Sequence, residues 1–203
     1  MGRLNVNDIL NDPDGFVNNT PILEKAKSFT SDADIKKAAN KLKQQDTVEK
    51  RVIESTLEQR KFANSVLYPL AKALNSFNAR SKEDYELFIA VAVDPAGELV
   101  VANSGLAPQG GSFAAPADTV FVMHWHHKAL SDIPDRGDHQ SVKRRAISGF
   151  VGTYNDRGFC CTLFEVGQQF DKKRKEYRFK YRQIKKDSTV KDWTERKRAN
   201  DWN

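Results

Sequence analysis

The chain has very little cysteine. Its 203 residues include only Cys160 and Cys161, which are adjacent. Neighbouring side chains of a strand point to opposite faces, and a disulfide between adjacent cysteines would be strained. A disulfide framework is therefore excluded, folding in a reducing cytoplasm is expected, and the two thiols are expected to pack as small apolar side chains.

Long apolar segments are also lacking. No run of about 18 apolar residues is present, so we expect no membrane span. Residues Met1–Asn7 lack the apolar core of a signal peptide, and Val6 stands where a myristoylation signal needs serine or threonine. The sequence predicts a protein that is cytoplasmic as synthesised, and it leaves open secretion by a route without a cleaved signal peptide.

Positive charge is concentrated at one end of the chain. The whole chain has 33 Lys and Arg against 27 Asp and Glu, a formal net charge of +6. Residues 171–203 contain 13 basic and 6 acidic residues, whereas the preceding residues contain 20 and 21. The body of the protein is thus close to neutral, and basicity belongs to the carboxyl-terminal segment.

This basic segment alternates aromatic and basic residues, as a strand with two different faces would. The alternating residues are Tyr177, Phe179 and Tyr181 on one face, and Arg178, Lys180 and Arg182 on the other. The basic face could contact phosphates or an acidic protein, or its charge could protect an edge strand from aggregation. The final residues, with Trp193 and Trp202, fit either a helix docked through its tryptophans or a mobile basic tail.

The first third of the sequence favours helices at the periphery of the fold. Turn-forming residues cluster at Asn11–Gly15 and Asn18–Pro21, and short helices are expected to start near Pro21 and Ser31.

A longer helical pattern follows, from about Asp46 to Asn75. Pro69 should kink or divide this helix, because proline removes a backbone donor and clashes with the preceding turn. The last apolar positions of the pattern recur at helical spacing, and they are Val66, Leu67, Leu70 and Leu74.

Strand patterns then replace the helical one. The continuous apolar run Leu87–Val93 is typical of a strand covered on both faces. The turn residues Asp94–Gly97 join it to a partner at Leu99–Ala102, and a loop over 105–118 leads to the next strand. Beyond a short helix, the remaining expected elements are a strand over 147–154, a turn over 155–158 and a strand over 159–166. The predicted class is α+β, a helical region followed by a mixed sheet with flanking helices.

The most informative motif is His124-Trp125-His126, which ends the apolar run that starts at Val120. Residues i and i+2 of a strand point to the same face, so both histidines can face one ion while Trp125 packs behind them. Asp138 follows about a dozen residues later, and from the start of the next helix it can supply an oxygen ligand. These three residues would close three sides of a zinc site, and a catalytic zinc keeps its fourth position for water.

Glu86 is the candidate proton carrier. Glu83 and Asp84 compete for this role, but Glu86 adjoins the apolar run, where burial raises the pKa of a carboxyl toward a range useful for general acid–base catalysis. His127 and His139 are expected to face solvent or to support the ligands by hydrogen bonds, and either could replace a ligand.

Together these residues resemble the JAB1/MPN/Mov34 (JAMM) metalloenzyme family, and within it the JAB-like domains of bacterial polymorphic toxins and secreted effectors. The family motif is a glutamate, then His-x-His, then Ser-x-x-Asp, and the resemblance covers about residues 60–167. It implies a JAMM/MPN-like mixed sheet, Glu86 as general acid/base, and Zn2+ held by His124, His126 and Asp138. It also divides the chain into a helical region (1–59), a zinc metallohydrolase core (60–167) and a basic carboxyl-terminal extension (168–203).

Two positions depart from the family pattern. Asp135 stands at the catalytic position where the family has the serine thought to hold the oxyanion, unless Ser131 fills that role out of register. A carboxylate donates no hydrogen bond unless it is protonated. His127 stands where the family commonly has proline.

Three classes of function fit these observations. The first is a toxin- or effector-like zinc metallopeptidase or isopeptidase that hydrolyses an amide or isopeptide bond of a protein or peptide, with an immunity or adaptor protein as a candidate partner. The second is a metal-dependent nuclease toxin, whose nucleic acid would contact the basic stripe. The third is a non-catalytic MPN-like binding module, in which Asp135 marks a lost oxyanion donor.

Overall fold

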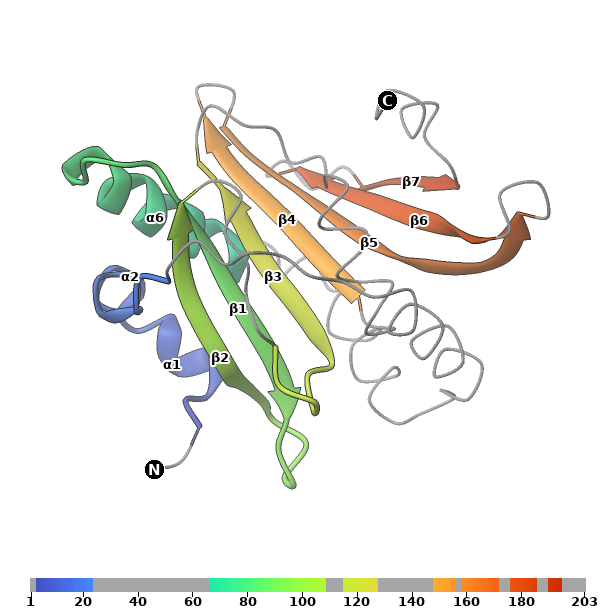
Figure 1. The fold of residues 1–203 in the computed structure, drawn as a ribbon, viewed down its shortest axis with the longest axis horizontal. Coiled ribbons are helices and arrows are strands. Elements are labelled where there is room, and N and C mark those ends of the chain that lie inside the picture. The colour runs from blue at the N-terminus through green and yellow to red at the C-terminus, as the bar shows by residue number, and fades with distance from the viewer. Residues whose placement is uncertain are drawn as a thin grey trace.

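Seven strands form one sheet in the part of the chain that the computed structural model describes, namely residues 3–23, 66–108, 115–127, 148–155, 158–171, 176–185 and 190–194 (Figure 1). The helices are α1 (Val6–Ile9), α2 (Pro13–Asn19) and α6 (Tyr68–Arg80). The strands are β1 (Tyr85–Val93), β2 (Leu99–Pro108), β3 (Phe121–His126), β4 (Ser148–Asn155), β5 (Gly158–Asp171), β6 (Glu176–Lys185) and β7 (Val190–Thr194).

The sheet is mixed, with strand order β2-β1-β3-β4-β5-β6-β7. The pair β3 and β4 is parallel, and every other neighbouring pair is antiparallel. A parallel pair requires a long crossover, here the chain between His126 and Ser148, whereas the antiparallel pairs are joined by shorter connections. Helices together with this sheet place the chain in the α+β class.

Helix α2 lies where the sequence predicts turns. Asp12 accepts a hydrogen bond from the backbone N–H of Gly15, and Pro13 occupies the first turn of α2. Both features are typical helix starts, because the cap satisfies a free N–H and proline has none to lose. The prediction that a helix starts near Pro21 is wrong, because Ile22 instead forms a β-bridge with Leu106 of β2. The expected helix near Ser31 lies outside the described residues.

Helix α6 begins where proline allows it to begin. Val66 and Leu67 form a π-helical turn, and the α-helix starts at Tyr68 with Pro69 in its first turn. Pro69 thus lies at the start of an α-helix, and the expected helical stretch before Val66 lies outside the described residues. The apolar positions named from the helical spacing are all buried against the sheet, and they are Val66, Leu67, Leu70 and Leu74.

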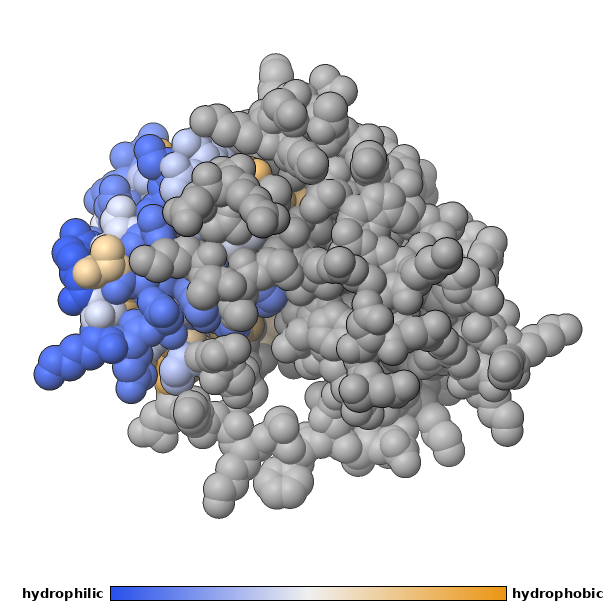
Figure 2. Space-filling model, turned by 90° about the horizontal axis from the view of Figure 1, so that it is seen from above, coloured by the Kyte–Doolittle hydropathy of each residue, from blue (hydrophilic) through white to orange (hydrophobic). Residues whose placement is uncertain are grey.

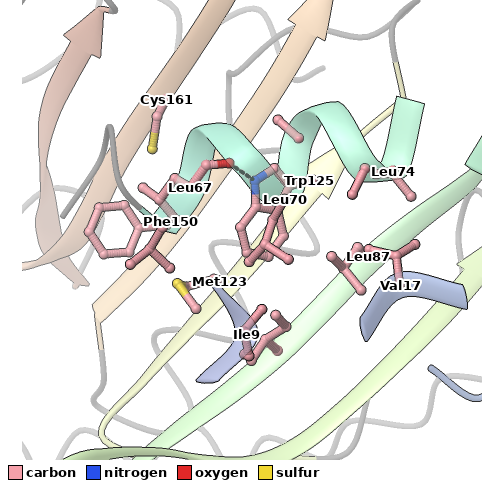
Figure 3. Packing of buried hydrophobic residues seen from close by; sticks show 14 of the residues in the cluster. Ile9, Val17, Leu67, Leu70, Leu74, Leu87, Met123, Trp125, Phe150 and Cys161 are labelled. Atoms are coloured by element: carbon pink, nitrogen blue, oxygen red, sulfur yellow. Dashed lines mark hydrogen bonds between the residues drawn. The ribbon is translucent and has the colours of Figure 1, made fainter. Parts of the chain in front are cut away.

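The hydrophobic core lies between α6 and one face of the sheet (Figure 3). Leu70 and Leu74 on α6 pack toward Leu87 on β1 and Trp125 on β3, all within the same buried cluster. Cys161 of β5 is also fully buried in this cluster, as expected of a small apolar side chain. The side chain of Cys160 lies outside the described residues.

Truncation of one side chain tests how much this core stabilises the fold. Leu70 is 0% exposed, so Leu70→Ala removes buried apolar atoms and leaves a cavity. We expect the free energy of unfolding to fall by about 2–5 kcal/mol, measured by urea denaturation. Lys72→Ala on the exposed side of the same helix serves as the control, and an equal loss there would contradict this packing.

The predicted hairpin of β1 and β2 is present. Gly97 adopts a positive φ of 85°, which favours glycine, and the side chain of Asp94 accepts hydrogen bonds from the N–H groups of Ala96 and Glu98. Both faces of β1 are buried along most of its length, as the continuous apolar run predicts.

Strand β2 is longer than the sequence predicts, because residues assigned to the following loop continue the strand to Pro108. The amino-terminal segment stabilises this extension at the sheet edge. Leu106 donates a backbone hydrogen bond to Pro21 and accepts one from Leu23, and Val101 donates one to Leu4. These backbone bonds cover part of an edge that would otherwise expose unpaired groups.

The basic carboxyl-terminal segment continues the same sheet. Strand β5 runs from Gly158 to Asp171, across the expected boundary at residue 167, and β6 and β7 follow it. The alternating segment does form a strand, but β6 lies between β5 and β7, so its interpretation as an edge strand is wrong. Trp193 lies in β7, so the docked-helix alternative for the final residues is wrong at that position. The division of the chain into domains stays a prediction.

The outer surface of the described part is mostly polar. The residues coloured in Figure 2 are mainly hydrophilic, and the large hydrophobic residues exposed among the described ones are Leu4 and Ile22. Of the helices that the structure describes, none has the length and apolarity needed to cross a membrane.

Candidate metal site

Strand β3 is fixed in the sheet by Trp125, the residue between the two histidines. Its indole Nε1 donates a hydrogen bond of 3.0 Å to the carbonyl of Leu67 at the start of α6 (Figure 3). On the neighbouring strand β4, Gly152 leaves room for the indole, since a Cβ there would lie 2.9 Å from Trp125 Cδ1. Because adjacent side chains alternate, anchoring Trp125 on the core face directs His124 and His126 to the opposite face.

The two histidines come together as the sequence motif predicts. Their Nε2 atoms lie 3.1 Å apart, and their ring centroids lie 4.9 Å apart with the planes inclined at 64°. Both side chains are buried, with His124 4% and His126 8% exposed. Both rings therefore present the same nitrogen to one point on this face of the sheet.

This separation fits two ligands of one zinc ion. Nitrogen ligands bind zinc at about 2.0–2.1 Å, and two ligands at this distance from the centre of a tetrahedron lie roughly 3.3 Å apart. The observed 3.1 Å is close to that value. The same distance suits a hydrogen bond between the rings when one Nε2 carries a proton, so the pair can exchange a shared proton for an ion.

Glu86 lies on the same face, next to the histidine pair. Phe88 of β1 is directly opposite His124 of β3, and extending this antiparallel register by one pair places Glu86 beside His126. Glu86 is only 8% exposed although it is charged at neutral pH in its ordinary state. Burial of a carboxyl beside two imidazoles is unusual for a purely structural residue and is common at functional sites.

The other two candidates for the proton-carrier role lie outside strand β1. Glu83 and Asp84 precede β1 and are exposed, and Asp84 Oδ2 lies 3.7 Å from Nδ1 of His127. His127 follows β3 directly, so the structure pairs it with Asp84 at the rim of the site.

The remaining predicted site residues lie outside the described part of the chain. These are Asp138, Asp135, Ser131 and His139, all within residues 128–147. Among the residues that are described, no three His, Cys, Asp or Glu side chains are grouped so as to hold a metal ion. The structure thus brings the two histidines together, and their role as metal ligands, like that of Asp138, stays a prediction.

Two further residues of this face were not found from the sequence. Thr153 of β4 is paired in register with His126 and is 1% exposed, and the ring of Phe88 stacks on the imidazole of His124. Neither residue has a motif of its own. Their positions follow from strand pairing, which joins residues that are far apart in the sequence.

No protein-family model matches the sequence, and no curated protein sequence matches it. The likeness to the JAMM family therefore rests on the motif residues, and membership of the family stays a prediction.

Proposed function

We propose that this chain is a zinc metallohydrolase of the JAMM type, a toxin- or effector-like enzyme that hydrolyses an amide or isopeptide bond of a protein or peptide. The observation that carries the proposal is the 3.1 Å separation of the His124 and His126 Nε2 atoms on a sheet face that also holds buried Glu86. A neutral imidazole pair beside a carboxyl supplies both the ligands and the proton carrier that such chemistry needs.

The histidines would hold zinc through Nε2, and Asp138 would supply the third ligand. Bound zinc would act as a Lewis acid that polarises the scissile carbonyl and acidifies a water molecule. Burial of both rings excludes competing water from the ligand nitrogens, and each ring must be neutral to offer its Nε2 lone pair.

Glu86 would move the proton. Its carboxylate oxygen would accept a proton from the attacking water and then donate it to the leaving nitrogen of the cleaved amide. Glu86 is two residues from Phe88, which is paired with His124, so its carboxyl would act from the same face as the ligands without being one of them. Its low exposure supports this role, because a buried carboxyl is more common at functional sites than at purely structural positions.

Asp135 is the weakest part of the family motif in this chain. In the catalytic position of the family's serine, it could donate a hydrogen bond to an oxyanion only when protonated. We therefore assign Asp135 to the catalytic position of the motif and Asp138 to the set of zinc ligands.

Substitution of these two aspartates separates their roles. Asp138→Ala should weaken metal retention strongly because it removes a ligand, whereas Asp135→Ala should leave zinc occupancy nearly unchanged. Both are measured by metal analysis of the purified variants. Equal loss of metal in the two variants would mean that the motif register is wrongly placed.

A metal-dependent nuclease is the main alternative, with the basic stripe as its nucleic-acid contact. The positive charge of the chain is confined to its carboxyl-terminal segment, because the residues before 171 include 20 basic and 21 acidic ones. A nearly neutral body offers little attraction to a phosphate backbone. We therefore favour a protein or peptide substrate over a nucleic acid.

Charge reversal of the stripe tests this choice. The triple variant Arg178→Glu, Lys180→Glu, Arg182→Glu should leave metal-dependent hydrolysis of protein substrates intact and change only solubility or partner docking. A nucleic-acid enzyme would instead bind DNA or RNA with an affinity that falls about one log unit per log unit of salt for each phosphate contacted. Cleavage of plasmid or RNA that is lost both in this variant and in His124→Ala would overturn the preference.

A further inference from the structure

The ring of Phe88 stacks on the imidazole of His124. Its centroid lies 5.4 Å from that of the His124 imidazole, and the two planes are inclined by only 8°. Phe88 and His124 are directly paired across β1 and β3, so the two rings stack side by side on one face of the sheet. Offset stacking at this distance is a favourable arrangement for two flat rings.

The backbone alone does not set the plane of the His124 ring. The χ2 torsion of histidine joins sp³ and sp² atoms, and its energy profile is broad. The position of His124 in the strand fixes its Cβ atom, but it does not fix the rotation of the ring about the Cβ–Cγ bond. A parallel aromatic ring on one side restricts the imidazole to one plane, and in that plane Nε2 of His124 lies 3.1 Å from Nε2 of His126.

Phe88 in turn has a neighbour on its far side. The β2 residue paired with Phe88 is Gly105, which has no side chain. The side chain of Leu23 fills this space, since a Cβ at Gly105 would lie 2.6 Å from Leu23 Cγ. Leu23 is held there by its backbone N–H, which donates a 2.7 Å hydrogen bond to the carbonyl of Leu106.

We propose that Phe88 is a positioning residue of the metal site, which holds the imidazole of His124 in its ligating orientation and is backed by Leu23 across Gly105. The inference rests on the proposed metal site. It adds a row of residues, from Leu23 over Gly105 and Phe88 to His124, that connects the amino-terminal segment to this site. Residues that orient a metal ligand typically change metal affinity by about 10–100-fold when they are replaced, without contacting the metal.

The test is the zinc affinity of the full-length chain, measured by competition with a chromophoric chelator after removal of bound metal. Phe88→Leu keeps an apolar side chain but removes the flat ring, and we expect it to bind zinc at least about tenfold more weakly. Phe88→Tyr restores the ring and should restore the affinity. Phe77→Leu is the matched control, because Phe77 is also half-buried and contacts an aromatic ring, that of Tyr85, away from the site.

Leu23→Ala gives a second measure that leaves Phe88 in place. It should weaken zinc binding in the same direction by about threefold, less than loss of the ring itself. Folding of each variant is judged by circular dichroism. If Phe88→Leu fails to fold, Leu23→Ala becomes the test of the inference, and an unchanged zinc affinity in Leu23→Ala would then contradict it.

The outcomes separate this inference from the proposed function. Wild-type affinity in folded Phe88→Leu, together with loss of binding in His124→Ala, would overturn the role of Phe88 and leave the metal site standing. An equal loss in Phe77→Leu would also overturn it, because affinity would then follow overall stability. Unchanged zinc affinity in His124→Ala would overturn the proposed site itself.

Discussion

Replacement of Glu86 by glutamine is expected to lower turnover at least about a hundredfold, the scale of general acid–base catalysis, while zinc content and folding stay as in the wild type. The substitution keeps the shape of the side chain and removes its ability to take up a proton. Glu86 is buried, and it lies on the sheet face of Phe88 and His124, so its loss acts at the site and not at the surface. The measurement is kcat on a peptide or isopeptide substrate with metal analysis of the same sample.

Glu83→Gln is the matched control for this experiment. Glu83 lies three residues earlier, outside the strand and exposed, so its loss should leave turnover unchanged. Full activity in Glu86→Gln with loss in Glu83→Gln would transfer the proton role to Glu83. Full activity in both would point to a binding module without catalysis.

The double variant His124→Ala, His126→Ala should lose both metal-dependent activity and stabilisation by zinc. A ligand that binds only the folded state stabilises it by roughly 4 kcal/mol at a thousandfold excess over its dissociation constant. We therefore expect zinc to raise the melting temperature of the wild-type protein and to leave that of the double variant unchanged, as measured by calorimetry after removal of bound metal.

His127→Ala provides the control within the same run of histidines. His127 follows the strand and lies near Asp84, so its removal should preserve the shift of melting temperature with zinc. A shift lost in His127→Ala and kept in the double variant would mean that the wrong histidines have been assigned to the metal.

The parts of the fold that were predictable from sequence are those with strong local patterns. The run Leu87–Val93 is buried on both faces, and the turn at Gly97 joins β1 to β2, because continuous apolar residues and a glycine with positive φ act over a few residues. The pairing of His124 with His126 was equally local, since it follows from strand alternation alone.

The parts that were missed depend on contacts between distant segments. Strand β2 extends past its predicted end because the amino-terminal residues Pro21 and Leu23 bind its edge. The edge-strand alternative for β6 fails because nothing in its own sequence indicates that β7 pairs with it. The start of α2 is different, because the Asp12-Pro13 pair is itself a helix-start signal inside a cluster of turn-forming residues.

The candidate site shows the same division. The histidines and Glu86 could be named from their motif, whereas Phe88 depends on how β1 and β3 are aligned. Alignment of paired strands is set by the whole buried face, because a slip by one residue would turn every side chain over. The burial of Leu87 and Trp125 on the core face therefore decides which residues stand beside the histidines.

Metal analysis by mass spectrometry of the purified protein tests the central claim most directly. The account predicts about one zinc per chain in the wild type, as expected of a single site with three protein ligands, and little or none in the His124→Ala, His126→Ala double variant. Zinc that is substoichiometric in the wild type and does not fall further in the double variant would contradict the assignment of these histidines to a metal, and with it the proposed hydrolase.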